Sequence, residues 1–220
     1  MTTYRLKFTT ESDATFGRGD GLASLIDAEV QHDRYGLPFL GGRSLKGLLE
    51  EECASILFAL KEQKKDQLFY DAARQLFGIP GSRDSDMAIL HISNARLPVN
   101  FREAIVAGVE RKELKSEQVL NSLTAIHRQT AMDESGTPKT GSLRVMRVIL
   151  RDTPFEAELT FTRSPSGMDL ALLAACVKAF RRAGTGRNRG RGELKAHLCN
   201  EKGDHVTEQH FENFKTKVME

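Results

Sequence analysis

Polar and hydrophobic residues alternate in several short segments of the chain, which predicts β-strands. Residues 4–8 place three large hydrophobic side chains on one face and two basic side chains on the other. Residues 155–161 show the same alternation most clearly. Three further strands are expected from apolar segments at 87–97, 143–151 and 193–199.

Hydrophobic residues recur at steps of three and four in other segments, which predicts helices. Ser44 is a suitable N-cap for the first of them. Gly78 and Gly184 are expected to end the second and the third. A weaker helical signal lies near 110–122, and a short helix is expected in the polar tail after Asn200. The three main helices are expected at about 44–60, 66–77 and 168–183.

The order of these elements is strand, helices, strand, insertion, strand, helix, strand, which favours an α+β fold. A sheet with helices on one side, as in ferredoxin-like domains, fits this order. The chain of 220 residues is long enough for one large domain. Residues 9–43 contain many turn formers and little periodicity, and a loop of this length is usually functional or disordered.

Composition indicates the environment of the protein more than its function. Hydrophobic residues make up 40% of the chain and Trp is absent, so aliphatic residues and Phe must form the core. The three cysteines are dispersed, which argues against a disulfide framework and a zinc site and favours free, buried thiols. No segment has the apolar length of a signal peptide or a membrane span, so we expect a cytoplasmic protein without a membrane partner. The net charge is only +2, so local clusters of charge matter more than the total.

One such cluster is the segment 184–192, GTGRNRGRG. Its four glycines allow the backbone to approach a ligand closely, and its three arginines are permanently charged groups that pair with phosphate. The segment lacks the ending of a Walker A loop, and its position between a helix and a strand is the reverse of a dinucleotide-binding loop. We interpret it as a loop that binds the phosphates of a polynucleotide, the alternative being a solvated turn.

A second glycine-rich segment, 36–47 (GLPFLGGRSLKG), leads into the first predicted helix. The free N–H groups and the dipole of a helix N-terminus favour an anion, and Ser44 and Lys46 are placed to add phosphate contacts. An ordinary capped helix is equally compatible with this pattern. Carboxylates before this segment are often only solvated, but beside a phosphodiester they can bind a divalent cation or assist proton transfer. They are Asp20, Asp27, Glu29 and Asp33.

Taken together, these segments resemble the RAMP superfamily, and most closely the backbone subunits of type III CRISPR effector complexes. Residues 26–33 (IDAEVQHD) and 36–47 are similar to the family's segment before its first helix. Leu76-Phe77-Gly78 matches its L-F-G motif, and residues 184–192 match its C-terminal glycine-rich loop. The similarity spans nearly the whole chain, with a loosely matched middle. The family's Pro-Gly-Ser-Ser is Gly-Gly-Arg-Ser at 41–44, which removes a rigid proline and adds the phosphate donor Arg43.

The resemblance implies a single RAMP domain over residues 1–220, with a ferredoxin-like, RRM-like core, a helical insertion at about 44–78 and a β-hairpin thumb at about 123–147. It implies that neighbouring copies or paralogous RAMP subunits stack along a CRISPR RNA guide (crRNA), together with other type III effector subunits. It also implies that the thumb wedges into the duplex of guide and target RNA. Asp27 falls on the position that cleaves the target RNA in a metal-dependent reaction, as base or as ligand of Mg²⁺ or Mn²⁺. Three thumb residues are expected to contact splayed bases: His127, Arg128 and Met132. The guide backbone is expected to contact Arg43, Ser44, Lys46, Arg187, Asn188, Arg189 and Arg191.

Alternatives stay open within the same superfamily and outside it. Within the superfamily, the alternatives are a non-catalytic structural RNA-binding subunit and an endoribonuclease that processes precursor crRNA. For the processing enzyme, His32 is the only histidine in the expected region. A pairing of His127 with Asp27 as acid and base competes with the commoner case of a solvated histidine. His205 in the polar tail has no partner at a useful spacing. A small nucleotide-binding enzyme is disfavoured by the reversed order of elements around 184–192.

Overall fold

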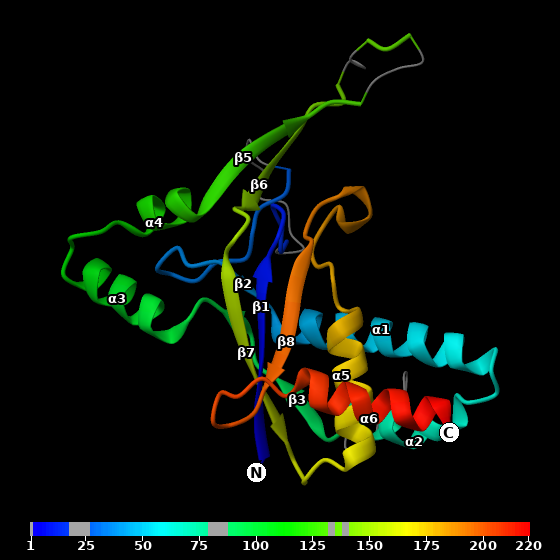
Figure 1. Ribbon diagram of the computed structural model, residues 1–220. Helices are drawn as coiled ribbons and strands as arrows, with labels where there is room; N and C mark the ends of the chain where they lie inside the picture. The colour runs from blue at the N-terminus through cyan, green and yellow to red at the C-terminus, as the bar shows by residue number, and fades with distance from the viewer. Residues whose placement is uncertain (1, 18–26, 79–87, 132–134, 138–140) are drawn as a thin grey trace.

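Figure 1 shows a computed structural model of the protein, in which residues 2–17, 27–78, 88–131, 135–137 and 141–220 are described. In chain order, the strands and helices are β1 (Thr2–Thr10), β2 (Phe39–Leu40), α1 (Gly42–Lys61), α2 (Gln67–Phe77), β3 (Leu90–Ile92), β4 (Ala95–Arg96), α3 (Val99–Glu110), α4 (Ser116–Leu123), β5 (Thr124–Gln129), β6 (Arg144–Ile149), β7 (Pro154–Phe161), α5 (Gly167–Ala179), β8 (Leu194–Cys199) and α6 (Thr207–Met219). None of the helices in these ranges has the length and apolarity needed to cross a bilayer.

The main sheet is antiparallel, and β1 lies at its centre between β7 and β8. Leu6 on β1 is opposite Ala157 on one side and Leu198 on the other. The strand order is β2-β4-β7-β1-β8, and β3 also pairs with β7. The core of the sheet has four strand positions, in the order β8, β1, β7 and β3/β4. Helices follow the first of these strands in sequence, β1, and the third, β7, and this arrangement is a ferredoxin-like topology. The predicted α+β fold class is therefore confirmed.

The strand predicted at 87–97 is interrupted in the structure. From Ile92 to Arg96 the chain advances four positions, while its partners on β7 run from Leu159 to Glu156, which is three positions. One extra residue on one strand is a β-bulge, which separates β3 from β4. The alternation in the sequence carries no signal for this insertion, because the bulge depends on the partner strand.

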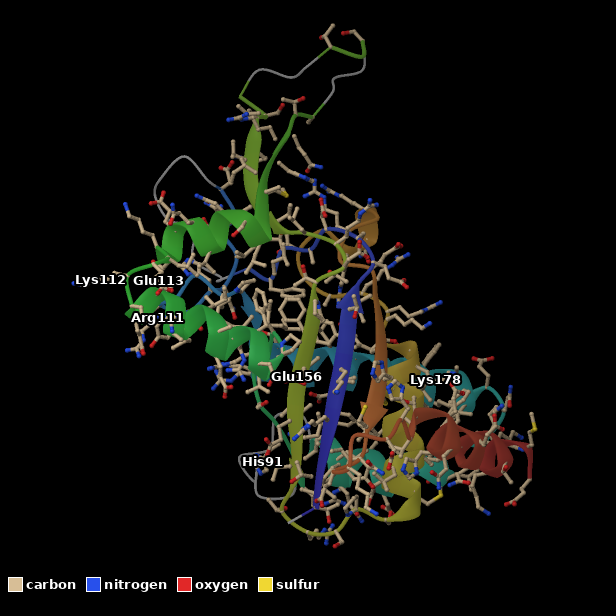
Figure 2. The ribbon with its side chains drawn as sticks, turned by 60° about the vertical axis from the view of Figure 1, so that its left-hand side comes forward. His91, Arg111, Lys112, Glu113, Glu156 and Lys178 are labelled. Atoms are coloured by element: carbon tan, nitrogen blue, oxygen red, sulfur yellow. The ribbon has the colours of Figure 1, made fainter. Side chains whose placement is uncertain are left out.

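Helices α1, α2 and α5 cover one face of the sheet, and α6 packs against α5 from outside (Figure 1). Phe8 on the inner face of β1 stacks on Phe155 of β7 at 5.2 Å between ring centroids and meets Phe180 edge-on at 5.9 Å. Burying an aromatic side chain of this size contributes about 1.5–3 kcal/mol, so these rings form the core in the absence of Trp. Lys178 of α5, labelled in Figure 2, pairs with Glu208 of α6 at 2.5 Å.

The first helix begins earlier than predicted. Gly41 is the N-cap of α1, so Ser44 lies within the first helical turn and does not cap it. Asn94, from the bulge between β3 and β4, accepts a hydrogen bond from the N–H of Gly42 at 2.8 Å. A side chain from the bulge between two strands thus takes the role that the sequence pattern assigned to Ser44.

Two other helical predictions differ from the structure. Helix α5 ends at Ala179, because the N–H of Ala183 donates to the carbonyl of Gly192 at 2.9 Å and the chain there is already extended. Helix α3 was missed, since most of its side chains are exposed or half-buried and it presents no clear apolar stripe.

Strands β5 and β6 form a separate two-stranded ladder that projects beyond the end of the main sheet (Figure 1). Isolated bridges from Ala14 to Ile149 and from Ala28 to Met146 connect β6 to the segments that follow β1. The thumb expected at about 123–147 falls on these strands. All three cysteines are free and buried.

Candidate nucleic-acid interface

The two glycine-rich segments line a common surface cleft of about 410 Å³. Ser44 and Gly47 face it from α1, and Gly184, Thr185 and Arg187 face it from the loop. The two segments are far apart in sequence. They meet because α1 lies against α5, and the loop follows α5.

Glycine is required at both ends of the loop 184–192. Gly184 has φ +91°, and a Cβ there would lie 2.5 Å from the carbonyl oxygen of Thr15. Gly192 has φ +66°, and a Cβ there would lie 1.9 Å from the carbonyl oxygen of Ala183. The N–H of Thr185 also donates to the carbonyl of Thr15 at 2.9 Å. The loop is therefore closed tightly at its base, and two of its three arginines lie on a short 3-10 turn at Arg187–Arg189.

The arginines of the loop have different surroundings. Arg187 donates to both carboxylate oxygens of Glu51 on α1, at 2.8 and 2.9 Å. Arg191 contacts the sulfur of Met146 on β6. Arg189 is exposed and lines a second cavity with Arg144, and its guanidinium has no ion pair within the described part of the chain. Asn188, between them, is exposed as well. Arg189 is thus the loop cation most available to a phosphate.

The start of α1 offers fewer ligands than the sequence suggests. Arg43 and Ser44 are exposed, and Ser44 lines the cleft. Lys46 instead donates to the carbonyl of Leu90 on β3 at 3.1 Å. Burial lowers the pKa of Lys46, and the nearby Glu50 acts in the opposite direction. Lys46 is not among the residues that line the cleft.

Asp27 lies beside β6, near the end of the ladder that is farther from the main sheet. Its N–H donates to the carbonyl of Val145 at 2.7 Å, and its Oδ2 accepts a hydrogen bond from the N–H of Val145 at 2.7 Å. Its Oδ1 lies 3.7 Å from Nη1 of Arg144, and the side chain is 44% exposed. One carboxylate oxygen is therefore held by the backbone, while the other lies near an exposed guanidinium and the side chain stays partly open to solvent. One strand joins the two parts of the surface, since Met146 contacts the loop and Val145 holds Asp27.

Glu29, unlike Asp27, is a buried carboxylate. Its Oε1 lies 2.9 Å from Nε of Arg147, and the two side chains are 8% and 13% exposed. The Nε–H is not aligned with an acceptor, so this contact is mainly an attraction between charges. Nη1 of Arg147 donates to Asn121 and Thr124 at 2.9 and 3.0 Å. The pair ties the segment after Asp27 to the hairpin, a role that no local pattern in the sequence indicates.

The thumb candidates lie on β5 or outside the described residues. Nε2 of His127 lies 3.3 Å from Oδ2 of Asp13, so its partner in the structure is Asp13 and not Asp27. Asp13 also accepts the N–H of Arg151 at 3.0 Å. Arg128 is exposed on β5, and Met132 lies outside the described residues.

The fold and this surface define an α+β protein of ferredoxin-like topology, with a projecting hairpin and a basic loop beside one cleft. The chain belongs to the RAMP superfamily, whose family model matches residues 7–195. The family resemblance drawn from the sequence motifs is thereby confirmed.

Solved structures share the fold at low sequence identity. A chain in the cryo-EM structure of the Type III-B Cmr-beta bound to cognate target RNA superposes with a TM-score of 0.63 at 14% identity, over 90% of this chain and 97% of that one. A chain in the apo state of the Type III-B Cmr-beta gives a TM-score of 0.63 at 14% identity, over 91% of this chain and 98% of that one. No curated protein sequence matches the chain.

Proposed function

We propose that this protein is a backbone subunit of a type III CRISPR ribonucleoprotein, which binds the sugar-phosphate backbone of a crRNA and cleaves complementary target RNA beside its thumb. The observation that carries the proposal is that the loop 184–192 borders the cleft beside the start of α1 and also contacts β6, the strand that holds Asp27. Membership of the RAMP superfamily supports it, as does the shared fold with a Cmr-beta chain solved with cognate target RNA.

Binding of the guide by its backbone follows from what a guide must do. A guide that pairs with a target has to expose its base edges, so the protein holds phosphate and sugar while pairing reads the sequence. The exposed guanidinium of Arg189 and the exposed side chains of Arg43 and Ser44 suit this task. Arg187 is engaged by Glu51, so a phosphate must displace that carboxylate before Arg187 can bind it.

The hairpin is suited to separating bases. Strands β5 and β6 stand clear of the main sheet, and Ile126 on β5 and Leu143 beside β6 are 39% and 52% exposed. Inserting such a side chain between bases costs about a few kcal/mol of unstacking, which contacts along the duplex must offset. Unstacking also frees the sugar-phosphate linkage beside the hairpin, so that a 2′-hydroxyl can align with the phosphorus.

Asp27 is the proposed catalytic residue at that linkage. Its exposed carboxylate oxygens suit a hard cation such as Mg²⁺ or Mn²⁺, which prefers oxygen ligands and commonly combines one or two carboxylates with substrate phosphates. No cluster of three potential ligands includes Asp27 in the described ranges, so the RNA and water would supply most of the coordination. A bound cation would neutralise the charge that develops on the phosphate during cleavage. The hydrogen bond from Val145 holds the carboxylate in place before RNA binds.

The test uses the complex reconstituted with its guide and partner subunits. Asp27→Ala removes the carboxylate, and Asp27→Asn keeps an acceptor for the N–H of Val145 but removes the charge. Both variants should bind guide and target as the wild type does and lose cleavage in Mg²⁺ or Mn²⁺. Asp71→Ala, at an exposed position on α2 far from the hairpin, is the matched control and should cleave normally (Figure 1).

The outcomes separate the alternatives. Undiminished cleavage by the Asp27 variants would exclude Asp27 from the reaction. A wild-type complex that binds target but leaves it intact in either metal would favour a purely structural subunit. Cleavage of precursor crRNA by the isolated chain would favour a processing endoribonuclease.

A further inference from the structure

Two histidines and one cysteine come together at the end of β8 opposite to the glycine-rich loop. His197 and Cys199 are two positions apart on the strand, so their side chains share one face of the sheet. His205 returns beside them after a turn and forms an isolated bridge with Cys199. The ligand atoms of the three side chains all lie within 4.8 Å of one another. The imidazole rings of His197 and His205 face each other, with 4.1 Å between their centroids.

The backbone of the turn sets this arrangement. The N–H of Asn200 donates to the carbonyl of Asp204 at 3.0 Å, and the N–H of Asp204 donates to Oδ1 of Asn200 at 2.9 Å. The N–H of Val206 then donates to the carbonyl of Leu198 at 2.9 Å, which places His205 across from Cys199. Within the described part of the chain, neither the two imidazoles nor the thiol has a hydrogen bond or an ion pair.

We propose that His197, Cys199 and His205 bind a zinc ion, with water as the fourth ligand. Imidazole nitrogen and thiolate sulfur are typical zinc ligands, at about 2.0–2.1 Å and 2.3 Å. Tetrahedral geometry at those lengths separates the ligand atoms by about 3.3–3.6 Å, so side-chain rotations that close roughly 1 Å complete the site. On binding, the Cys199 thiol releases its proton to solvent and coordinates as thiolate.

The chemistry of this site separates it from the cation proposed at Asp27. Two nitrogens and one sulfur suit zinc, whereas Mg²⁺ and Ca²⁺ require oxygen ligands. Cys199 is fully buried beneath the turn and His205 is exposed, so the open coordination position faces solvent on the His205 side. The ion would join β8 to the turn that leads into α6.

Neighbouring charges set the expected affinity. Lys7 lies opposite His197 and Arg5 lies opposite Cys199 on β1, so two cations flank the site. Like charges oppose a divalent ion, which makes the negative charge of the thiolate essential. Replacing Lys7 by Gln should therefore tighten metal binding on the order of tenfold, since one opposing charge is removed.

The test uses the purified full chain, stripped with a chelator and titrated with Co²⁺ as a spectroscopic substitute for Zn²⁺. We expect one equivalent of Co²⁺ to produce a thiolate-to-cobalt charge-transfer band and tetrahedral d–d bands, and one equivalent of Zn²⁺ to displace it. Cys199→Ser should abolish the charge-transfer band. His197→Gln and His205→Gln should each weaken binding on the order of tenfold or more.

Two controls keep the result specific. His91→Gln replaces a histidine on β3, labelled in Figure 2, and should leave the titration unchanged. Asp27→Ala should also leave it unchanged, so the result stands apart from the proposed RNA cleavage. Circular dichroism confirms that each variant is folded. Absence of the charge-transfer band in the wild type, its persistence in Cys199→Ser, or equal weakening by His91→Gln would overturn the proposal.

Discussion

The buried pair of Glu29 and Arg147 offers the sharpest test of how the hairpin is held. Glu29→Gln keeps the size of the side chain and an oxygen that can accept the N–H of Val30, which Oε1 of Glu29 accepts at 2.9 Å. It removes the charge that faces Nε of Arg147 at 2.9 Å. Arg147 is 13% exposed, so its positive charge is left without compensation in a site that water barely reaches.

The magnitude follows from the burial of both partners. Breaking a buried pair by removing one partner costs about 3–5 kcal/mol. Because Arg147 keeps its hydrogen bonds to Asn121 and Thr124, we expect about 3 kcal/mol, the lower end of that range. For a chain of this length, that loss lowers the Tm by roughly 6–12 °C. The double variant Glu29→Gln/Arg147→Met removes both charges and should recover most of the loss.

The assay is urea unfolding of the four proteins in a double-mutant cycle, with hydrogen exchange to locate the effect. We expect faster exchange at the amides of β5 and β6 in Glu29→Gln, with the amides of β1 and β7 less affected. Equal stability of Glu29→Gln and wild type, or additive losses in the double variant, would show that the pair does not anchor the hairpin.

Four further variants test the loop and its cleft. Gly192→Ala should destabilise the protein by more than about 1–2 kcal/mol, the cost of a positive φ alone, because its Cβ would meet the carbonyl of Ala183. Gly47→Ala, at an open helical position of α1, should instead stabilise the protein by about 1 kcal/mol, and thermal unfolding compares the two variants. Glu51→Ala should tighten binding of a single-stranded RNA by freeing Arg187, and weaker binding would contradict the competition inferred between carboxylate and phosphate. Arg189→Ala should weaken binding of all RNA sequences alike and reduce the slope of log K against log salt by about one, as measured by fluorescence anisotropy.

Local patterns in the sequence were sufficient for most of the sheet and for the family. The alternation at residues 4–8 and 155–161 marks β1 and β7, because each strand buries one face and exposes the other. The spacing of glycine, arginine and aspartate in three separated segments pointed to the RAMP superfamily, which the family match over residues 7–195 bears out. These patterns can be recognised in the sequence because each one involves residues that are close together along the chain.

Contacts between residues that are distant in sequence could not be predicted from such local patterns. The cap of α1 comes from Asn94, the partner of His127 is Asp13, and Glu29 is neutralised by Arg147. A dispersed set of cysteines argued against zinc, yet Cys199 lies beside His205 once the turn folds back. The periodicity of hydrophobic residues determined the strands and helices of this protein. Only the tertiary structure decided which charges face one another, because contacts between side chains depend on packing across strands and not on order along the chain.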